Sequence, residues 1–158
     1  DVDVFNLDLL AFSRLMRDMA YTGEWRPVFE FLAEAVAEQT SIRDYLTGEK
    51  VIQTFLLAYL NVTDYYLTRS EQEMGKGFAD LYLEPFWPKH RDVAYSYLIE
   101  LKYIPRGAFS EQMLQDKLAE AATQLQQYTD APCLRHSINL TCVALVFSGW
   151  ELQAAAAF

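Results

Sequence analysis

Apolar residues in the first sixty positions recur with the period of amphipathic helices. Two stripes keep this spacing, one formed by Leu7, Leu10, Ala11, Leu15 and Met16, the other by Phe29, Leu32, Ala33 and Val36. Pro27 fits the first turn of the second helix, where a backbone N–H has no helical partner. A third helix is expected from about Glu49 to Leu60, with Thr47 as its candidate N-cap.

The pattern changes near Asn61, where β-prone segments separated by turn residues replace the helical spacing. Residues 65–70 are β-prone, and the glycines within residues 75–77 then interrupt the chain. Residues 78–85 predict a strand that ends at a proline, and residues 93–104 predict a longer and more buried one. Because a short loop joins these two strands, they are expected to form a hairpin.

Another helical pattern follows, with Ser110 as its candidate N-cap and Glu111 in its first turn. Its apolar stripe alternates steps of four and three through Leu114, Leu118, Ala121, Leu125 and Tyr128. Residues 137–153 predict one or two further strands with a turn at Ser148-Gly149. The run of alanines after residue 153 predicts no particular element.

This order of elements predicts an α/β fold in which helices pack on a small mixed sheet. A chain of 158 residues is long enough for one domain with its own core and too short for two. We therefore expect a single domain over residues 1–158. It would have a helical part at residues 1–46 and a core of αβββαβ order at residues 47–153.

Composition excludes several classes of protein. Apolar residues make up 52% of the chain, which is typical of a folded domain. No window approaches the roughly 18 apolar residues of a membrane span, and the acidic N-terminus lacks the basic flank of a signal peptide. Cys133 and Cys142 stand outside any CxxC or Cys/His cluster, so two reduced thiols are expected rather than a zinc site or a disulfide. These features predict a cytoplasmic protein without a membrane partner.

The net charge of −9 argues against nucleic-acid binding, which normally requires a basic surface. Residues 51–158 contain twelve acidic and eight basic residues. Four of these acidic residues cluster in the region of the two central strands: Glu71, Glu73, Asp80 and Glu100. Bound divalent cations would neutralise part of this charge locally.

Asp80, Glu100 and Lys102 stand out because they are charged residues within apolar strands. Alternation along a strand places Glu100 and Lys102 on one face and the apolar neighbours on the other. If the strands are neighbours, two carboxylates and an ammonium group converge, and such carboxylates can bind Mg²⁺. The lysine would then orient or deprotonate a water, or stabilise charge on phosphoryl oxygens. The alternative is a structural ion pair between the carboxylates and Lys102 or a neighbouring base.

Four segments carry a resemblance to a known family: GKGFADLYLEP at residues 75–85, SYLIELKYI at 96–104, LAEAATQLQQYTDA at 118–131 and INLTCVALVFSG at 138–149. In this order they resemble a nuclease domain that follows AAA-ATPase-like modules in bacterial proteins. That domain belongs to the PD-(D/E)xK superfamily. The resemblance runs from about residue 49 to residue 147 and implies a restriction-endonuclease-like core.

The resemblance implies roles for the charged residues of the strands. Asp80 and Glu100 match metal ligands for Mg²⁺ or Mn²⁺, helped by the main-chain carbonyl of Leu101, and Lys102 matches the catalytic lysine. Glu49 matches a glutamate that supplies a further metal ligand in some members. The alternative for Glu49 is a first-turn glutamate that the helix dipole favours.

The same resemblance assigns three residues to substrate binding. Gln124 and Tyr128 match a glutamine-and-tyrosine motif, and their spacing of four places them on one helix face. Glu73 matches the glutamate that precedes the glycine-rich turn. The alternatives are a core aromatic for Tyr128, a solvated polar residue for Gln124 and a solvated loop carboxylate for Glu73.

Two positions depart from the family pattern and leave two functions open. Phe78 stands where the family commonly has a basic residue, and Gln53 where it often has a histidine. The first function is a metal-dependent nuclease that hydrolyses phosphodiester bonds of DNA or RNA. The second is a catalytically inactive interaction domain of nuclease fold, which partners an ATPase module or another protein. The charge of −9 and Phe78 favour the second; the intact Asp80, Glu100 and Lys102 favour the first.

Overall fold

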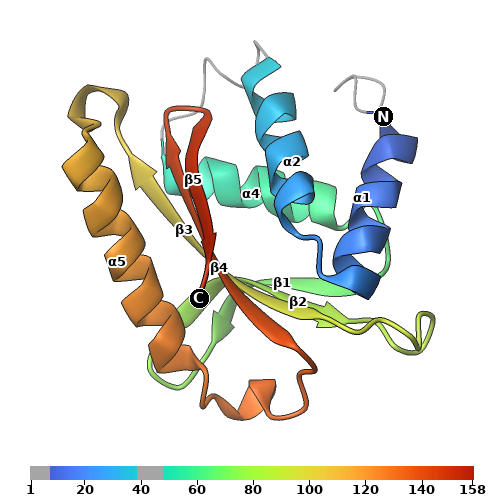
Figure 1. Cartoon of the computed structure of the whole chain (residues 1–158). Helices are drawn as coiled ribbons and strands as arrows, with labels where there is room; N and C mark the ends of the chain where they lie inside the picture. Colours follow the sequence, from blue (N-terminus) through green and yellow to red (C-terminus); the bar gives the residue numbers. More distant parts are fainter. Residues whose placement is uncertain (1–7, 39–47) are drawn as a thin grey trace.

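A computed structural model describes residues 8–38 and 48–158 of the chain (Figure 1). The helices are α1 (Leu9–Thr22), α2 (Arg26–Glu38), α4 (Glu49–Leu60) and α5 (Glu111–Tyr128). The strands are β1 (Tyr66–Glu73), β2 (Phe78–Pro85), β3 (Ser96–Ile104), β4 (Leu140–Ser148) and β5 (Glu151–Ala157). Two short 3-10 helices, Arg106–Ala108 and Pro132–Leu134, flank α5 along the chain.

The first helix forms where its periodicity predicts it but buries a partly different face. Asp8 caps α1 by accepting a hydrogen bond from the N–H of Ala11 at 3.0 Å. The buried stripe is Phe12, Met16, Met19 and Ala20, whereas Leu10 is 63% exposed. Of the predicted stripe, Met16 is buried and Leu15 packs partly against the core, whereas Leu10 is exposed, because Phe12 and Met19 provide the larger apolar face. Leu7 lies outside the described residues.

The next two helices agree closely with their patterns. In α2 the predicted stripe is buried, and Pro27 lies in the first turn as expected. Helix α4 spans the predicted range, and Gly48 occupies its N-cap position without a side-chain hydrogen bond. Thr47, the predicted cap, lies outside the described residues.

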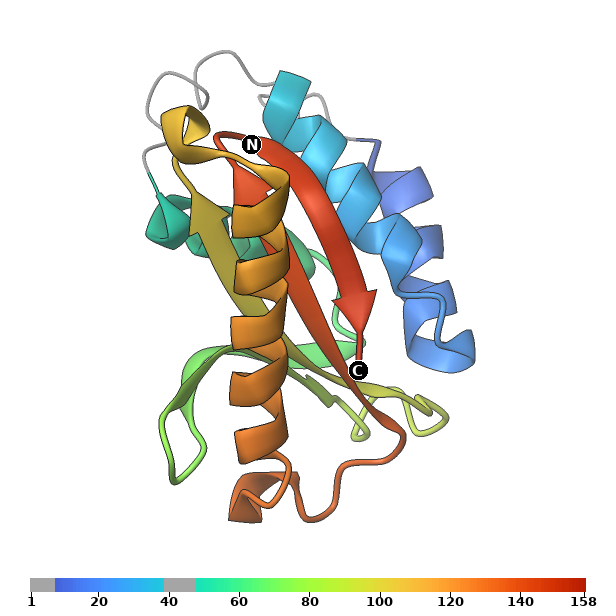
Figure 2. The same cartoon turned by 60° about the vertical axis from the view of Figure 1, so that its left-hand side comes forward.

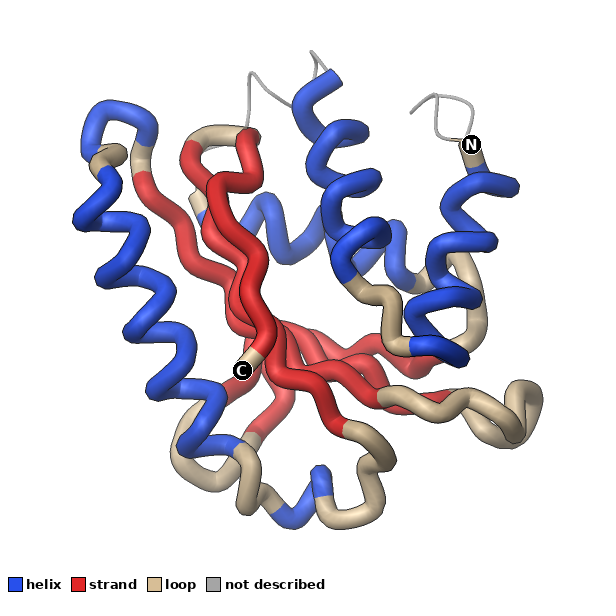
Figure 3. The backbone as a smooth tube through the Cα atoms, in the orientation of Figure 1, coloured by secondary structure: helices blue, strands red, loops and turns tan. Residues whose placement is uncertain are grey.

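The five strands form one mixed sheet in the order β1-β2-β3-β4-β5 (Figure 3). Strands β1, β2 and β3 pair antiparallel, so the expected neighbourhood of β2 and β3 is confirmed. Strand β4 pairs parallel to β3, and the connection between them contains α5, as parallel pairing requires. Strand β5 returns antiparallel to β4 through a turn at residues 149–150. It extends to Ala157, beyond residue 153 where the core was expected to end.

Helices cover both faces of this sheet (Figure 2). One face packs against α1, α2 and α4 in a core that includes Phe12, Leu32, Leu56, Leu83 and Tyr97. On the other face α5 packs through a second core that includes Tyr82, Leu98, Ala121, Leu125 and Ala144. The α/β architecture with helices on a mixed sheet is thus confirmed, and it is consistent with a restriction-endonuclease-like fold.

Local signals for α5 and for the cysteines are also confirmed. Ser110 caps α5, since its hydroxyl accepts a hydrogen bond from the N–H of Met113 at 3.0 Å. Cys133 and Cys142 are both free thiols. Within residues 8–38 and 48–158, none of the helices is long and apolar enough to cross a membrane.

Candidate active site

The candidate site forms where β2 and β3 separate. Their pairing extends from Leu83–Tyr97 to Leu81–Ile99. Beyond that point the Asp80 side chain replaces the backbone ladder, because its Oδ2 accepts a hydrogen bond from the N–H of Leu101 at 2.8 Å. Asp80 and Glu100 therefore lie side by side on adjacent strands, as expected.

Glu100 is a buried carboxyl group with an unsatisfied oxygen. Only 3% of the residue is exposed, and its Oε1 atom is buried without a hydrogen-bond partner. Burial raises its pKa, and repulsion from Asp80 raises it further. When protonated, Glu100 donates a hydrogen bond to Asp80. A buried acceptor of this kind fits a group that binds a cation.

Burial also raises the pKa of Asp80, although the hydrogen bond from Leu101 and the one from Glu100 oppose the shift. The two carboxyl groups titrate as a pair, since two negative charges cannot be held together at low cost in a buried site. A divalent cation placed between them would remove that cost.

Lys102 lies on the same face of β3 as Glu100 and is 9% exposed. Ile99 and Leu101 point into the core on the opposite face, so the predicted alternation is confirmed. The Lys102 charge lowers the pKa of both Asp80 and Glu100, which places it near them. Its ammonium Nζ, however, donates to Glu120 Oε1 of α5 at 3.2 Å.

Helix α4 adds a third carboxylate through its N-terminus. Glu49 is an exposed residue, but partial desolvation of its carboxyl group and the charge of Asp80 raise its pKa, whereas Lys102 lowers it, so Glu49 lies within electrostatic range of Asp80. Gln53, one turn further on, is 4% exposed. Its Nε2 donates to the main-chain carbonyl of Asp80 at 2.8 Å, which fixes α4 against β2.

A sequence comparison identifies the family to which this arrangement belongs. The profile of the PD-(D/E)XK nuclease superfamily matches residues 47–156, from the start of α4 into β5. The chain belongs to this superfamily. No curated protein matches the chain at a significant level.

Members of the PD-(D/E)XK superfamily generally use divalent metal ions, and the oxygen donors here fit one. Glu100 provides a buried oxygen without a partner, and Asp80 and Glu49 provide carboxylates whose charge is poorly compensated. Hard cations prefer such oxygen ligands. Among residues 8–38 and 48–158, no group of three or more His, Cys, Asp and Glu side chains is placed to hold a metal ion, so the fit rests on the pair Asp80 and Glu100. Waters and phosphate oxygens would complete the coordination.

Glu71 of β1, one of the four acidic residues noted in the region of the two central strands, lies near the cluster, although the sequence alone did not assign it a ligand role. It occupies the position across from Asp80, where backbone pairing is interrupted, and has a φ of 51°. Such a left-handed conformation is strained for a residue other than glycine. Its Oε1 accepts from Lys50 Nζ at 2.6 Å and from Gln53 Nε2 at 3.3 Å. The signal in the sequence is the alternation of Glu71 and Glu73 along one strand face.

Helix α5 carries Gln124 and Tyr128, and Tyr128 lies near the carboxylate cluster. The Oε1 of Gln124 is buried without a hydrogen-bond partner. Tyr128 is 5% exposed, belongs to the core, and donates from its hydroxyl to the carbonyl of Phe78 at 3.3 Å. Burial raises its pKa, followed by the charges of Glu100 and Asp80, so its ring lies near them. The packing supports a structural role for Tyr128, and a substrate contact remains a prediction.

Glu73 and Leu101, two further residues of the predicted site, differ from the residues above in what they contribute. Glu73 is exposed at the end of β1, and its carbonyl accepts a weak hydrogen bond from the Cys133 thiol at 3.7 Å. Leu101 contributes its N–H to Asp80, and metal binding by its carbonyl remains a prediction. Glu120, which pairs with Lys102, was missed by sequence reasoning; its signal is a spacing of four before Gln124, on the same helix face.

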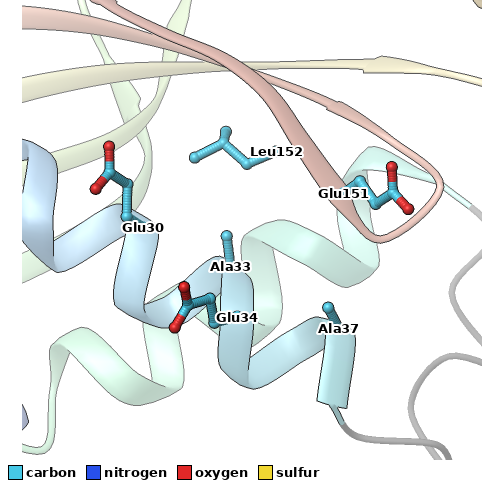
Figure 4. Close-up of a pocket in the computed structure, with 6 residues that line it drawn as sticks. All are labelled: Glu30, Ala33, Glu34, Ala37, Glu151 and Leu152. Carbon is cyan, nitrogen blue, oxygen red and sulfur yellow. The ribbon is translucent and has the colours of Figure 1, made fainter.

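A surface hollow of about 390 Å³ lies between α2 and the start of β5 (Figure 4). It is bounded by Glu30, Ala33, Glu34 and Ala37 of α2 and by Glu151 and Leu152 of β5. None of the residues that line this hollow belongs to the carboxylate cluster.

Proposed function

We propose that this chain is a metal-dependent nuclease that hydrolyses phosphodiester bonds of DNA or RNA. The observation that carries the proposal is the buried, unpartnered Oε1 of Glu100 next to Asp80, with Lys102 on the same strand face. Two carboxyl groups with raised pKa values and a nearby ammonium group are costly for stability. Such an arrangement is typical of a reactive centre rather than of a structural ion pair.

The proposed roles follow from position. Asp80 and Glu100 hold Mg²⁺ or Mn²⁺, with Glu49 as a further ligand and the Leu101 carbonyl as a main-chain one. Lys102 orients the attacking water or stabilises negative charge on the phosphoryl oxygens. The bound cation would supply the charge that acidifies the water and stabilises the transition state. Gln124, Tyr128 and Glu73 are proposed to line the path of the substrate.

Lysines near the candidate site weaken the argument against nucleic-acid binding that the net charge of −9 raises. Three lysines act on the carboxylate cluster: Lys102 on Asp80 and Glu100, Lys117 on Glu49, and Lys50 on Glu71. They come from three different elements, β3, α5 and α4. Together with a bound divalent cation, these lysines would offset part of the negative charge that a polyanionic substrate meets at the candidate site.

The test is cleavage of labelled single- and double-stranded DNA and RNA with Mg²⁺, with Mn²⁺ and with EDTA. The wild-type chain should cut at least one of these substrates only when metal is present, and Asp80→Ala and Lys102→Met should abolish the cut. A thermal melt provides a second readout, because the metal should raise the melting temperature of wild type but not of Asp80→Ala. Absence of both cleavage and stabilisation would rule out the proposal.

A second candidate is a catalytically inactive interaction domain that pairs with an ATPase module or another protein. Phe78, which is 58% exposed at the start of β2, favours it, because an exposed aromatic side chain suits protein contact better than phosphate contact. An ATPase module and a bacterial source rest on the family resemblance, and a cytoplasmic location rests on the composition of the chain. Metal-dependent stabilisation without cleavage, together with capture of an ATPase by the wild-type chain but not by Phe78→Lys, would favour this candidate.

A further inference from the structure

The Lys102 ammonium group requires an anionic partner that does not also bind the metal ion. The residue is 9% exposed, and a buried ammonium group is costly without an anionic hydrogen-bond partner. Asp80 and Glu100 lie near it, but in the proposed function both bind a cation that would repel Lys102. A third carboxylate outside the metal site would resolve this conflict.

Glu120 is placed to be that carboxylate. Its Oε1 accepts a hydrogen bond from Lys102 Nζ at 3.2 Å, and its Oε2 lies 3.4 Å from Lys117 Nζ. The pKa of Glu120 is raised by burial, but hydrogen bonds and charge from the two lysines outweigh this and lower it overall. Helix α5 is fixed against β3 and β4 by its buried residues, so the backbone of Glu120 has a defined position, and the two lysines hold its half-exposed side chain.

We propose that Glu120 is a positioning residue that holds the Lys102 ammonium group in place for catalysis. Lys117, one turn earlier on α5, balances the second oxygen of Glu120. The inference rests on the proposed nuclease function for its catalytic consequence, whereas the placement of Lys102 by Glu120 can be measured without activity.

The test compares Glu120→Gln with Asp116→Asn. Asp116 is exposed one turn before Glu120 and is paired with Gln112 at 2.9 Å, so this control removes the same charge from the same helix. Glu120→Gln should lower kcat about 100-fold, because a displaced catalytic group loses its alignment. Its KM and its stabilisation by Mn²⁺ should stay within about twofold of wild type, and Asp116→Asn should leave kcat unchanged. A kcat for Glu120→Gln equal to wild type would overturn the inference.

Two further measurements separate this inference from the nuclease proposal. In the background of Lys102→Met, Glu120→Gln should cause no further loss of kcat, since the two residues act through one contact. Independently of activity, the ¹⁵N-lysine spectrum should show a slowly exchanging ammonium signal that Lys102→Met removes. Glu120→Gln should abolish or shift this signal and Asp116→Asn should not. An unchanged signal in Glu120→Gln would overturn the inference even if the chain cuts no substrate.

Discussion

At the scale of single residues, Glu100 determines how stability responds to pH. Burial and the charge of Asp80 raise its pKa in the folded state, so the folded chain binds more protons than the unfolded chain above the ordinary value of 4.5. Stability of the metal-free protein should therefore fall as pH rises from the ordinary value of 4.5 towards the folded-state pKa of about 9. Glu100→Gln removes this titration and should flatten the dependence.

The measurement is urea unfolding in EDTA at several pH values, for wild type and Glu100→Gln. At the alkaline end the variant should be the more stable protein, because it carries no charge to bury. If the unfolding free energy changed equally with pH in the two proteins, Glu100 would titrate normally. Its surroundings would then be more solvated than its burial implies.

Gln53 gives a second prediction at this scale. Its side chain is 4% exposed and donates to the carbonyl of Asp80 at 2.8 Å and to Glu71 at 3.3 Å. Gln53→Ala leaves a buried carbonyl without its donor and should cost about 1–3 kcal/mol of unfolding free energy. Gln126→Ala, at an exposed position of α5, is the control and should change the free energy little. A neutral Gln53→Ala would mean that water replaces the amide.

Sequence reasoning found the charged residues within strands but not their partners. Asp80, Glu100 and Lys102 are conspicuous because a charge in an apolar strand is costly, and that cost can be recognised from the sequence. Glu120 is an ordinary glutamate on a polar stretch, and only the folded chain shows that it meets Lys102. Glu71 was noted only as one of four acidic residues near the two strands, and the folded chain shows its influence on Asp80. Gln53 was noted as the absence of a histidine, whereas the structure gives it a supporting role.

At the scale of elements, α5 connects folding to the candidate site, since it carries Glu120 and Gln124. Its N-terminus is capped by Ser110, which accepts from the N–H of Met113 at 3.0 Å. Ser110→Ala should lower the unfolding free energy by about 1 kcal/mol. Chemical denaturation measures the change, and Ser110→Asp, which retains a capping oxygen, should restore most of it. An equal loss in both variants would assign the effect to packing instead of capping.

Elements with a strong periodic pattern could be predicted, and those defined by pairing could not. Strand β2 and helix α5 have clear alternation and a clear apolar stripe, and both ends of β2 were anticipated. Strand β5 consists largely of alanine, which has no preference for strands, and it forms because β4 offers an unpaired edge. The buried face of α1 likewise depends on which face the sheet can accommodate.

At the scale of the whole molecule, the family match and the hydrophobic core include different parts of the chain. The match begins at residue 47, so α1 and α2 lie outside it. Yet both helices contribute fully buried side chains to the core shared with the sheet: Phe12, Met16, Met19, Val28, Leu32 and Val36. Tyr97 of β3 also donates from its hydroxyl to the carbonyl of Met19 at 2.7 Å. The two helices therefore cover a face of the nuclease core that would otherwise be exposed.

This packing predicts that residues 47–158 alone do not form a stable domain. Each of the six buried side chains in α1 and α2 contributes about 1.5–3 kcal/mol, and the sum reaches the total stability of about 5–15 kcal/mol that is typical of a protein. The truncated chain should lose its cooperative thermal transition by circular dichroism and bind a hydrophobic dye. Leu10→Ala in the full chain is the control, since Leu10 is 63% exposed and its truncation should leave the transition in place. A truncated chain that melts cooperatively near the temperature of the full chain would show that the matched region folds without α1 and α2.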